Sequence, residues 1–177
     1  MANIILRKQG EYAVLDMEYV SAEYSGAGLF SQELELDATD FATDVAENGM
    51  CLTVVGNKVK KPAVGDMVKI LATECEIYEE GKGRNTFAVK RGKGSQPRLV
   101  TPVSGDCIST NAVLYDNTEF TDLSALKTAV DGGTVKAIPS TTGFWKLTAT
   151  TTGAKVIGEV IAVVNLSNEE IGVRIRF

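Results

Sequence analysis

The final seven residues constrain the fold of this chain more than any other stretch. Ile171–Phe177 alternates strictly, with an apolar side chain at every odd position and Gly or Arg at every even one. A period of two predicts a β-strand with one buried face and one wet face. Lys155–Val164 is rich in Val and Ile and predicts a strand covered on both faces, while Asn165–Glu170 has the composition of a turn. We therefore predict a terminal β-hairpin with Phe177 in the core.

A short motif occurs twice, forty residues apart. Pro62–Val68 and Pro102–Ile108 share the pattern P-x-x-G-D-x-[V/I]. Proline fixes φ, glycine accepts a positive φ, and aspartate hydrogen-bonds the nearby backbone, so each copy predicts a turn that leads into a strand. This reading favours Asp66 and Asp106 as turn residues over a pair of catalytic carboxylates.

The rest of the chain predicts a mainly β fold. Short apolar runs are separated by Gly, Pro and Asn, and only Thr121–Gly133 has helical spacing, with Thr121 or Asp122 as the N-cap and two glycines at its end. We expect a small β-barrel or β-sandwich-like domain with one short helix and an extended N-terminal arm. The expected division is an arm and entry segment over residues 1–49 and a β-rich domain over residues 50–177.

Residues 10–33 mix aromatic, small and acidic side chains without a sustained period. They fit either a loop-rich entry into the domain or an arm that lies on a partner protein. Aromatic side chains are enriched at protein interfaces. The candidate partner-binding residues of this segment are Tyr12, Tyr19, Tyr24 and Phe30.

Charge divides the chain unevenly. Residues 9–57 contain ten acidic residues and no Lys or Arg, whereas residues 58–98 contain ten basic and five acidic residues. Arg91–Ser95 lacks the glycine spacing of a phosphate-binding loop, and Pro97 stands where the helix after such a loop should begin. The two remaining interpretations are a solvated hairpin tip and a basic patch for an acidic protein partner. The candidate partner-binding residues here are Lys82, Arg84, Arg91 and Lys93.

Composition argues against several kinds of chemistry. The chain has no His, so hydrolases with an imidazole base and mixed Cys/His zinc sites are excluded. Its three cysteines, Cys51, Cys75 and Cys107, are far apart and predict buried free thiols, with an intermolecular disulfide as the alternative. We expect that the chain is not an enzyme and that it has no cofactor-binding or metal site. No apolar run is long enough for a membrane span, and residues 1–20 predict no secretory signal, which favours the cytoplasm of the producing cell.

Two stretches of the chain resemble a known family. The P-x-x-G-D turn with its strand, then KVIGEVIAV, a polar turn and VRIRF, resembles capsid decoration (cement) proteins of tailed double-stranded DNA phages. Such proteins often close with an IG-x-[VA] strand and a V-R-[VI]-x-[LF] strand. The resemblance covers Thr101–Ile108 and Ala154–Phe177. It implies a small β-barrel or sandwich with an N-terminal extension, and oligomers seated where capsid proteins meet.

Four functions follow as hypotheses. The first is a structural virion protein on the outer capsid surface, made in the host cytoplasm, whose partners are the major capsid protein and further copies of itself. The second is another phage structural subunit, of the tail tube or baseplate. The third is a nucleic-acid-binding β-barrel; the net charge of −5 and the few aromatic residues near the basic stretch argue against direct nucleic-acid binding. An enzyme with an unrecognised carboxylate site is the least favoured reading.

Overall fold

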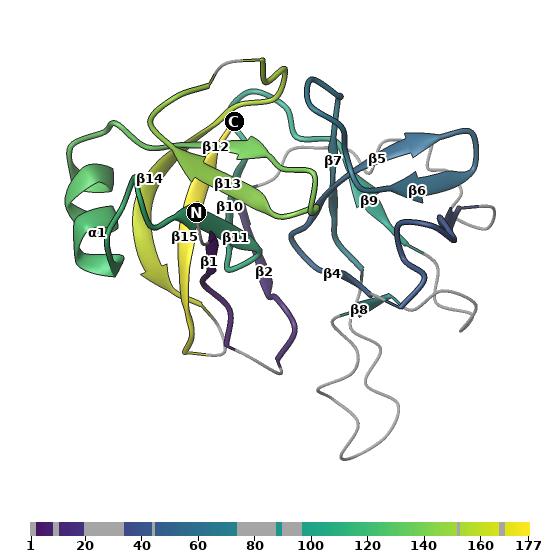
Figure 1. Cartoon of the computed structure of the whole chain (residues 1–177), viewed down its shortest axis with the longest axis horizontal. Helices are drawn as coiled ribbons and strands as arrows, with labels where there is room; N and C mark the ends of the chain where they lie inside the picture. The colour runs from purple at the N-terminus through teal and green to yellow at the C-terminus, as the bar shows by residue number, and fades with distance from the viewer. Residues whose placement is uncertain are drawn as a thin grey trace.

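The computed structural model describes residues 3–8, 11–19, 34–43, 45–73, 88–89, 97–151, 153–166 and 169–177. Within these ranges the protein is mainly β, with three sheets and one short helix, as the sequence predicts. Figure 1 shows a larger sheet with the helix on one side of the molecule and the smaller sheets on the other.

The larger sheet has eight strands in the order β1-β11-β13-β12-β14-β15-β10-β2. Within this sheet, only the pairing of β11 with β13 is parallel. The strands are β1 (Asn3–Ile5), β2 (Leu15–Tyr19), β10 (Cys107–Thr110), β11 (Val113–Asp116), β12 (Lys136–Pro139), β13 (Trp145–Thr148), β14 (Gly158–Asn165) and β15 (Ile171–Arg176). Only two residues separate β10 from β11, yet these strands lie near opposite ends of the strand order. The sheet must therefore curl until its ends approach, which gives a half-barrel.

The smaller sheets lie beside this half-barrel. Five strands follow the order β3-β6-β5-β7-β9, and β4 pairs with β8. The strands are β3 (Glu35–Leu36), β4 (Ala46–Glu47), β5 (Cys51–Val55), β6 (Lys58–Lys60), β7 (Lys69–Leu71), β8 (Ala88–Val89) and β9 (Leu99–Val100). Residues 1–49, which we expected to form an arm and entry segment, thus contribute β1 and β2 to the edges of the large sheet, β3 to the second sheet and β4 to the third.

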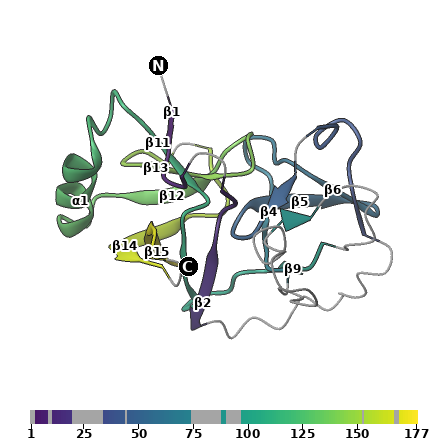
Figure 2. The ribbon, with the colours of Figure 1, turned by 90° about the horizontal axis from the view of Figure 1, so that it is seen from below.

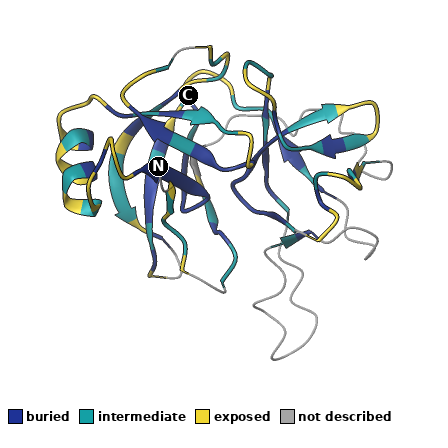
Figure 3. Ribbon diagram, in the orientation of Figure 1, coloured by how far each residue is buried: buried dark blue, intermediate teal, exposed yellow. Residues whose placement is uncertain are grey.

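Two apolar clusters form the core, and the sheets share them (Figure 3). The first fills the half-barrel around Trp145 but also contains Cys51 and Ile70 of the second sheet. The second cluster contains Leu114 of the large sheet. The Trp145 indole N–H donates to the Gly49 carbonyl at 2.9 Å. Because each sheet supplies side chains to the other's core, the two halves support one another.

The terminal hairpin forms as predicted, with β14 and β15 paired antiparallel, and the Leu166 N–H donates to the Glu170 carbonyl where the two strands are joined. Ile175 is fully buried, whereas Phe177 is partly buried and packs against Trp145 with ring centroids 5.3 Å apart. The expectation that β14 is covered on both faces is wrong at Ile161, which is 38% exposed. Pairing shifts between Val160 and Ala162, so Ile161 is the extra residue of a bulge.

Both copies of the repeated motif form the same turn. In the first, the Asp66 N–H donates to the Ala63 carbonyl, and the Asp66 carboxylate accepts from the Ala63 N–H at 2.8 Å. In the second, Asp106 makes the same two bonds to Val103. The glycine before each aspartate has a positive φ, 83° at Gly65 and 98° at Gly105, which residues with a side chain rarely adopt. The prediction that both aspartates are turn residues is confirmed.

The helix α1 (Leu123–Asp131) also follows its sequence signals. Asp122 caps its N-terminus, because the carboxylate accepts from the Ala125 N–H at 2.8 Å. Leu126 and Val130 are buried in the core of the half-barrel, and the helix packs beside β14 (Figure 1). It lies on the far side of the large sheet from the smaller sheets and takes no part in the site described next.

Candidate functional site

The N-terminal segment runs antiparallel to residues 107–116 on both sides of an excursion. Asn3–Ile5 pairs with Leu114–Asp116, and Leu15–Tyr19 pairs with Cys107–Thr110. The purple path of β1 and β2 can be followed in Figures 1 and 2. Between these strands, Arg7, Lys8 and residues 11–14 lie outside the sheet, opposite the short link between β10 and β11; this part of the segment is called the excursion. We call residues 3–8 and 11–19 together the N-terminal strap.

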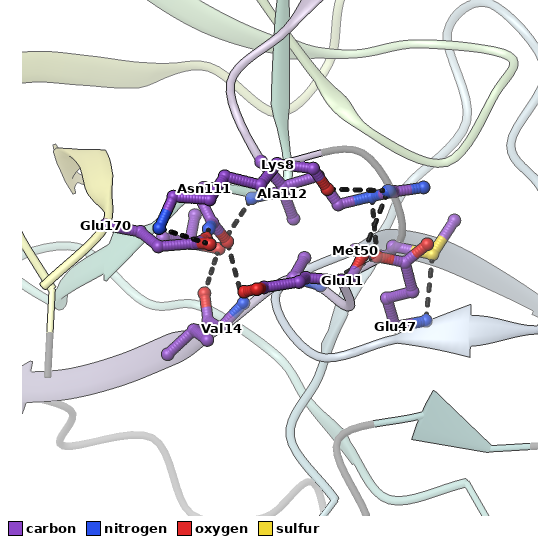
Figure 4. A network of polar contacts seen from close by, with 11 residues as sticks. Lys8, Glu11, Val14, Glu47, Met50, Asn111, Ala112 and Glu170 are labelled. Carbon is purple, nitrogen blue, oxygen red and sulfur yellow. Dashed lines mark hydrogen bonds and ion pairs between the residues drawn. The ribbon is translucent and has the colours of Figure 1, made fainter. Parts of the chain in front are cut away.

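Side chains of other elements bind the main chain of the strap where it returns to the sheet (Figure 4). The Val14 N–H donates to Asn111 Oδ1 at 2.7 Å, and the Val14 carbonyl accepts from Thr110 Oγ1 at 2.7 Å. The Ala13 N–H donates to Glu47 Oε2, also at 2.7 Å. Thr110 and Asn111 are completely buried. Main-chain groups that leave the sheet ladder are thus satisfied by three polar side chains.

Two buried carboxylates extend this network to the charged residues of the strap. Arg7 Nε lies 2.9 Å from Glu47 Oε2, and the Arg7 guanidinium also donates to the Glu11 carbonyl at 3.0 Å. Glu170 accepts from Asn111 Nδ2 at 2.5 Å and pairs with Lys8 Nζ at 3.6 Å. Glu47 and Glu170 are only 5% and 3% exposed, so their charges need these partners.

The arrangement joins chain segments that are far apart in sequence. Glu47 comes from β4, Glu170 from the turn before β15, and Asn111 from the link between β10 and β11. Each interacts with the strap or with a residue that does. Sequence reasoning missed these residues, although Asn111 interrupts an otherwise strand-like run, ISTNAVLY, which was a signal for a break in the strand.

The structure places two of the predicted partner-binding residues on the strap. Tyr12 is partly buried in the excursion, and Tyr19 ends β2 opposite Cys107. The remaining candidates lie outside the described residues: Tyr24, Phe30, Lys82, Arg84, Arg91 and Lys93. That the basic stretch binds an acidic protein partner stays a prediction.

Within the described residues, Cys51 and Cys107 form no disulfide. Cys51 is completely buried in β5, and its thiol donates to the Gly143 carbonyl at 3.3 Å. Burial raises the pKa of Cys51 to about 12, so its thiolate is scarce at neutral pH. Cys107 is partly exposed in β10, and Cys75 lies outside the described residues. The prediction of a buried thiol is thus confirmed for Cys51.

A small apolar hollow lies between the two larger sheets. Leu15 and Met17 of β2 and Ile108 of β10 line one side, and Ile70 of β7 and Val100 of β9 line the other. Met17 is 48% exposed at this edge. The Asp106 carboxylate at the margin is engaged by the Val103 N–H. The hollow offers contact area to an apolar group and carries no chemistry of its own.

Within the described parts of the chain, no group of three or more Cys, Asp or Glu side chains could hold a metal ion. No helix in those parts is both long and apolar enough to cross a membrane. No protein-family model matches the chain, and no match was found among curated proteins or solved structures.

Proposed function

We propose that this chain is a structural virion protein that binds the outer surface of a tailed-phage capsid and stabilises contacts between capsid subunits. The observation that carries the proposal is the spatial relation between the two stretches that resemble decoration proteins. β10, which follows the second P-x-x-G-D turn, pairs with β15 along Cys107–Thr110. The turn itself is joined to the terminal strand, since the Gly105 N–H donates to the Phe177 carbonyl and the Phe177 N–H to the Asp106 carbonyl.

The two stretches therefore form one structural unit, although 45 residues (109–153) separate them in sequence. This supports treating the resemblance as a shared local architecture. It also gives the capsid hypothesis more support than two unrelated short motifs would.

The proposed mechanism is adhesive. Val64 and Met67 are 79% and 62% exposed on the first P-x-x-G-D turn, whose backbone is held by the Asp66 carboxylate. Large apolar side chains on a rigid turn give contact area at low entropic cost. On a fixed lattice many such contacts act together through effective concentration, so modest single interfaces give durable attachment. The proposed partners are the major capsid protein and neighbouring copies of this chain.

Co-sedimentation with empty capsids assembled from the cognate major capsid protein tests this proposal. We expect the wild-type chain to sediment with capsids, and the double variant V64S/M67S to lose binding at an unchanged melting temperature. The matched control is V55S, because Val55 is 59% exposed at the end of β5. No co-sedimentation of the wild type would refute the proposal.

The basic candidates require a separate variant. Exchange of Arg84, Arg91 and Lys93 for Ser should lower attachment and reduce its dependence on salt, because exposed charges are screened over about 8–10 Å at physiological ionic strength. Self-polymerisation without capsids would favour the tail alternative, and salt-sensitive retention on DNA would favour nucleic-acid binding. Removal of residues 1–30 is a poor test, since it deletes both β1 and β2.

A further inference from the structure

We propose that the N-terminal strap is an exchangeable element, and that the strap of one copy occupies the same site on a second copy of this chain. The surface that receives it consists of residues 107–116 together with Glu47 and Glu170. Reciprocal exchange would join two copies through contacts already present within each one.

The position of the strap in the sheet permits its departure. β1 and β2 are the outermost strands of the eight-stranded order, and among the described strands each pairs with one neighbour, β11 and β10 respectively. Withdrawal of the strap therefore parts no other strand pair of the large sheet. It does expose the edges of β10 and β11, and unpaired edges are templates for a strand from another chain.

The receiving surface forms hydrogen bonds mainly with the main chain of the strap. Thr110 and Asn111 bind both main-chain polar groups of Val14, and Glu47 binds the Ala13 N–H. These bonds fix the register of any strand laid beside them. A second copy presents the same backbone with the same flanking residues, so every bond and ion pair of the closed form is reproduced in the exchanged form. This equality of contacts is what makes exchange of an identical element between copies inexpensive.

Apolar contacts give the site its specificity for this strap. Ile4, Leu6 and Leu15 pack against the first core cluster, and Ala13 belongs to the second. The spacing of these side chains around the excursion matches two separate apolar regions. An unrelated strand would leave one of the regions empty, which favours a second copy of this chain as the occupant.

The length of chain between the strap and the next described residue bounds how far the strap could reach. Residues 20–33 separate Tyr19 from Leu34, and a chain of this length spans at most about 50 Å. A linker of this length gives an intramolecular effective concentration on the order of millimolar. Exchange should therefore become substantial when copies are brought to similar concentrations. It needs no capsid and is testable on the isolated protein.

A disulfide trap distinguishes exchange from the closed form, because Tyr19 lies opposite Cys107 in the β2–β10 register. One copy carries Y19C and C107S, and a second, mass-tagged copy keeps the native Tyr19 and Cys107. The two are mixed at about 1 mM in a glutathione redox buffer. We expect a disulfide between the Y19C thiol and Cys107 of the other copy, identified by peptide mass mapping.

Three further variants make the outcome decisive. V55C/C107S carries an exposed thiol away from the strap and sets the level of random coupling. Adding N111A to the tagged copy should speed trapping, because its own strap is held less tightly, but should leave the final yield unchanged, since the closed and exchanged forms lose the same acceptor for Val14. Y19C with Cys107 retained reports the closed form by an intramolecular disulfide.

A trans yield no higher than that of V55C/C107S, alongside the intramolecular disulfide, would overturn the proposal. Failure of both disulfides would overturn the register on which it depends. Should Y19C prevent folding, N3C and D116C divided between the two copies provide a second trap, because Asn3 lies opposite Asp116. Trapping in that pair supports exchange, and its absence refutes it.

Discussion

Replacement of Asn111 by alanine should destabilise the protein far more than the loss of one exposed amide. Asn111 is completely buried, and its side chain accepts from the Val14 N–H and donates to Glu170 Oε2. Alanine leaves both groups without this partner inside the protein. A buried group left unsatisfied costs about 1–3 kcal/mol, and a charged acceptor costs more.

The remaining contacts of Glu170 limit the penalty. Lys8 Nζ stays within 3.6 Å of the other carboxylate oxygen. We therefore expect N111A to lower the free energy of unfolding by about 3–4 kcal/mol, which is a large share of the 5–15 kcal/mol typical of a folded domain. Urea unfolding followed by tryptophan fluorescence would measure this change, since Trp145 is the single tryptophan and is fully buried.

Asn165 provides the matched control, because it is exposed at the end of β14. N165A should change the free energy of unfolding by less than about 0.5 kcal/mol. Hydrogen exchange adds a local readout: in N111A the amides of residues 13–15 should lose protection before those of β15. A stability of N111A within 0.5 kcal/mol of N165A would refute the assigned role of the buried network.

Other predictions concern single positions. A Cβ on Gly172 would lie 2.7 Å from a main-chain oxygen of β10, so G172A should lower the free energy of unfolding by about 1–3 kcal/mol. A Cβ on Gly132 would have its nearest main-chain contact at 3.5 Å, so G132A should change the stability little. Thermal unfolding of both variants would measure the difference. Cys51 should resist thiol reagents at pH 8 until the protein unfolds, because burial raises its pKa to about 12; rapid labelling of the native protein would contradict this. Hydrogen bonds from the Thr118 N–H and hydroxyl lower the pKa of Asp116, so its carboxylate stabilises the fold above about pH 4 and loses this effect as the pH falls below that value. D116N should therefore weaken the acid dependence of the melting temperature, and an unchanged acid profile would count against it.

Local features were predictable from the sequence because their causes are local. The terminal hairpin follows from a period of two with a polar turn, and α1 follows from its N-cap and its terminal glycines. The repeated P-x-x-G-D turns needed only a glycine with positive φ and an aspartate that bonds a backbone N–H three residues earlier. In each case the residues that make the structure are close in sequence.

The alternation at the C-terminus predicted which side chains face the half-barrel core but not what covers the other face. Val173 and Ile175 are fully buried, as expected. Gly172 is also buried, although its position in the pattern assigned it to the wet face. Leu166 folds back from the turn close to Gly172, and a neighbouring strand approaches it. Because Gly172 has no side chain, Leu166 and β10 can approach it closely. The alternation within the strand does not predict this contact.

Tertiary structure alone decided the strand order and the polar network. Nothing in ISTNAVLY indicates that its two halves become β10 and β11 near opposite ends of a curled sheet, or that the N-terminal segment pairs along both. Glu47, Asn111 and Glu170 look like ordinary surface or turn residues in sequence. They are buried because the excursion of the strap brings main-chain donors and basic side chains to them. Such interactions depend on segments up to about a hundred residues apart, and their energy appears only once the whole chain has folded.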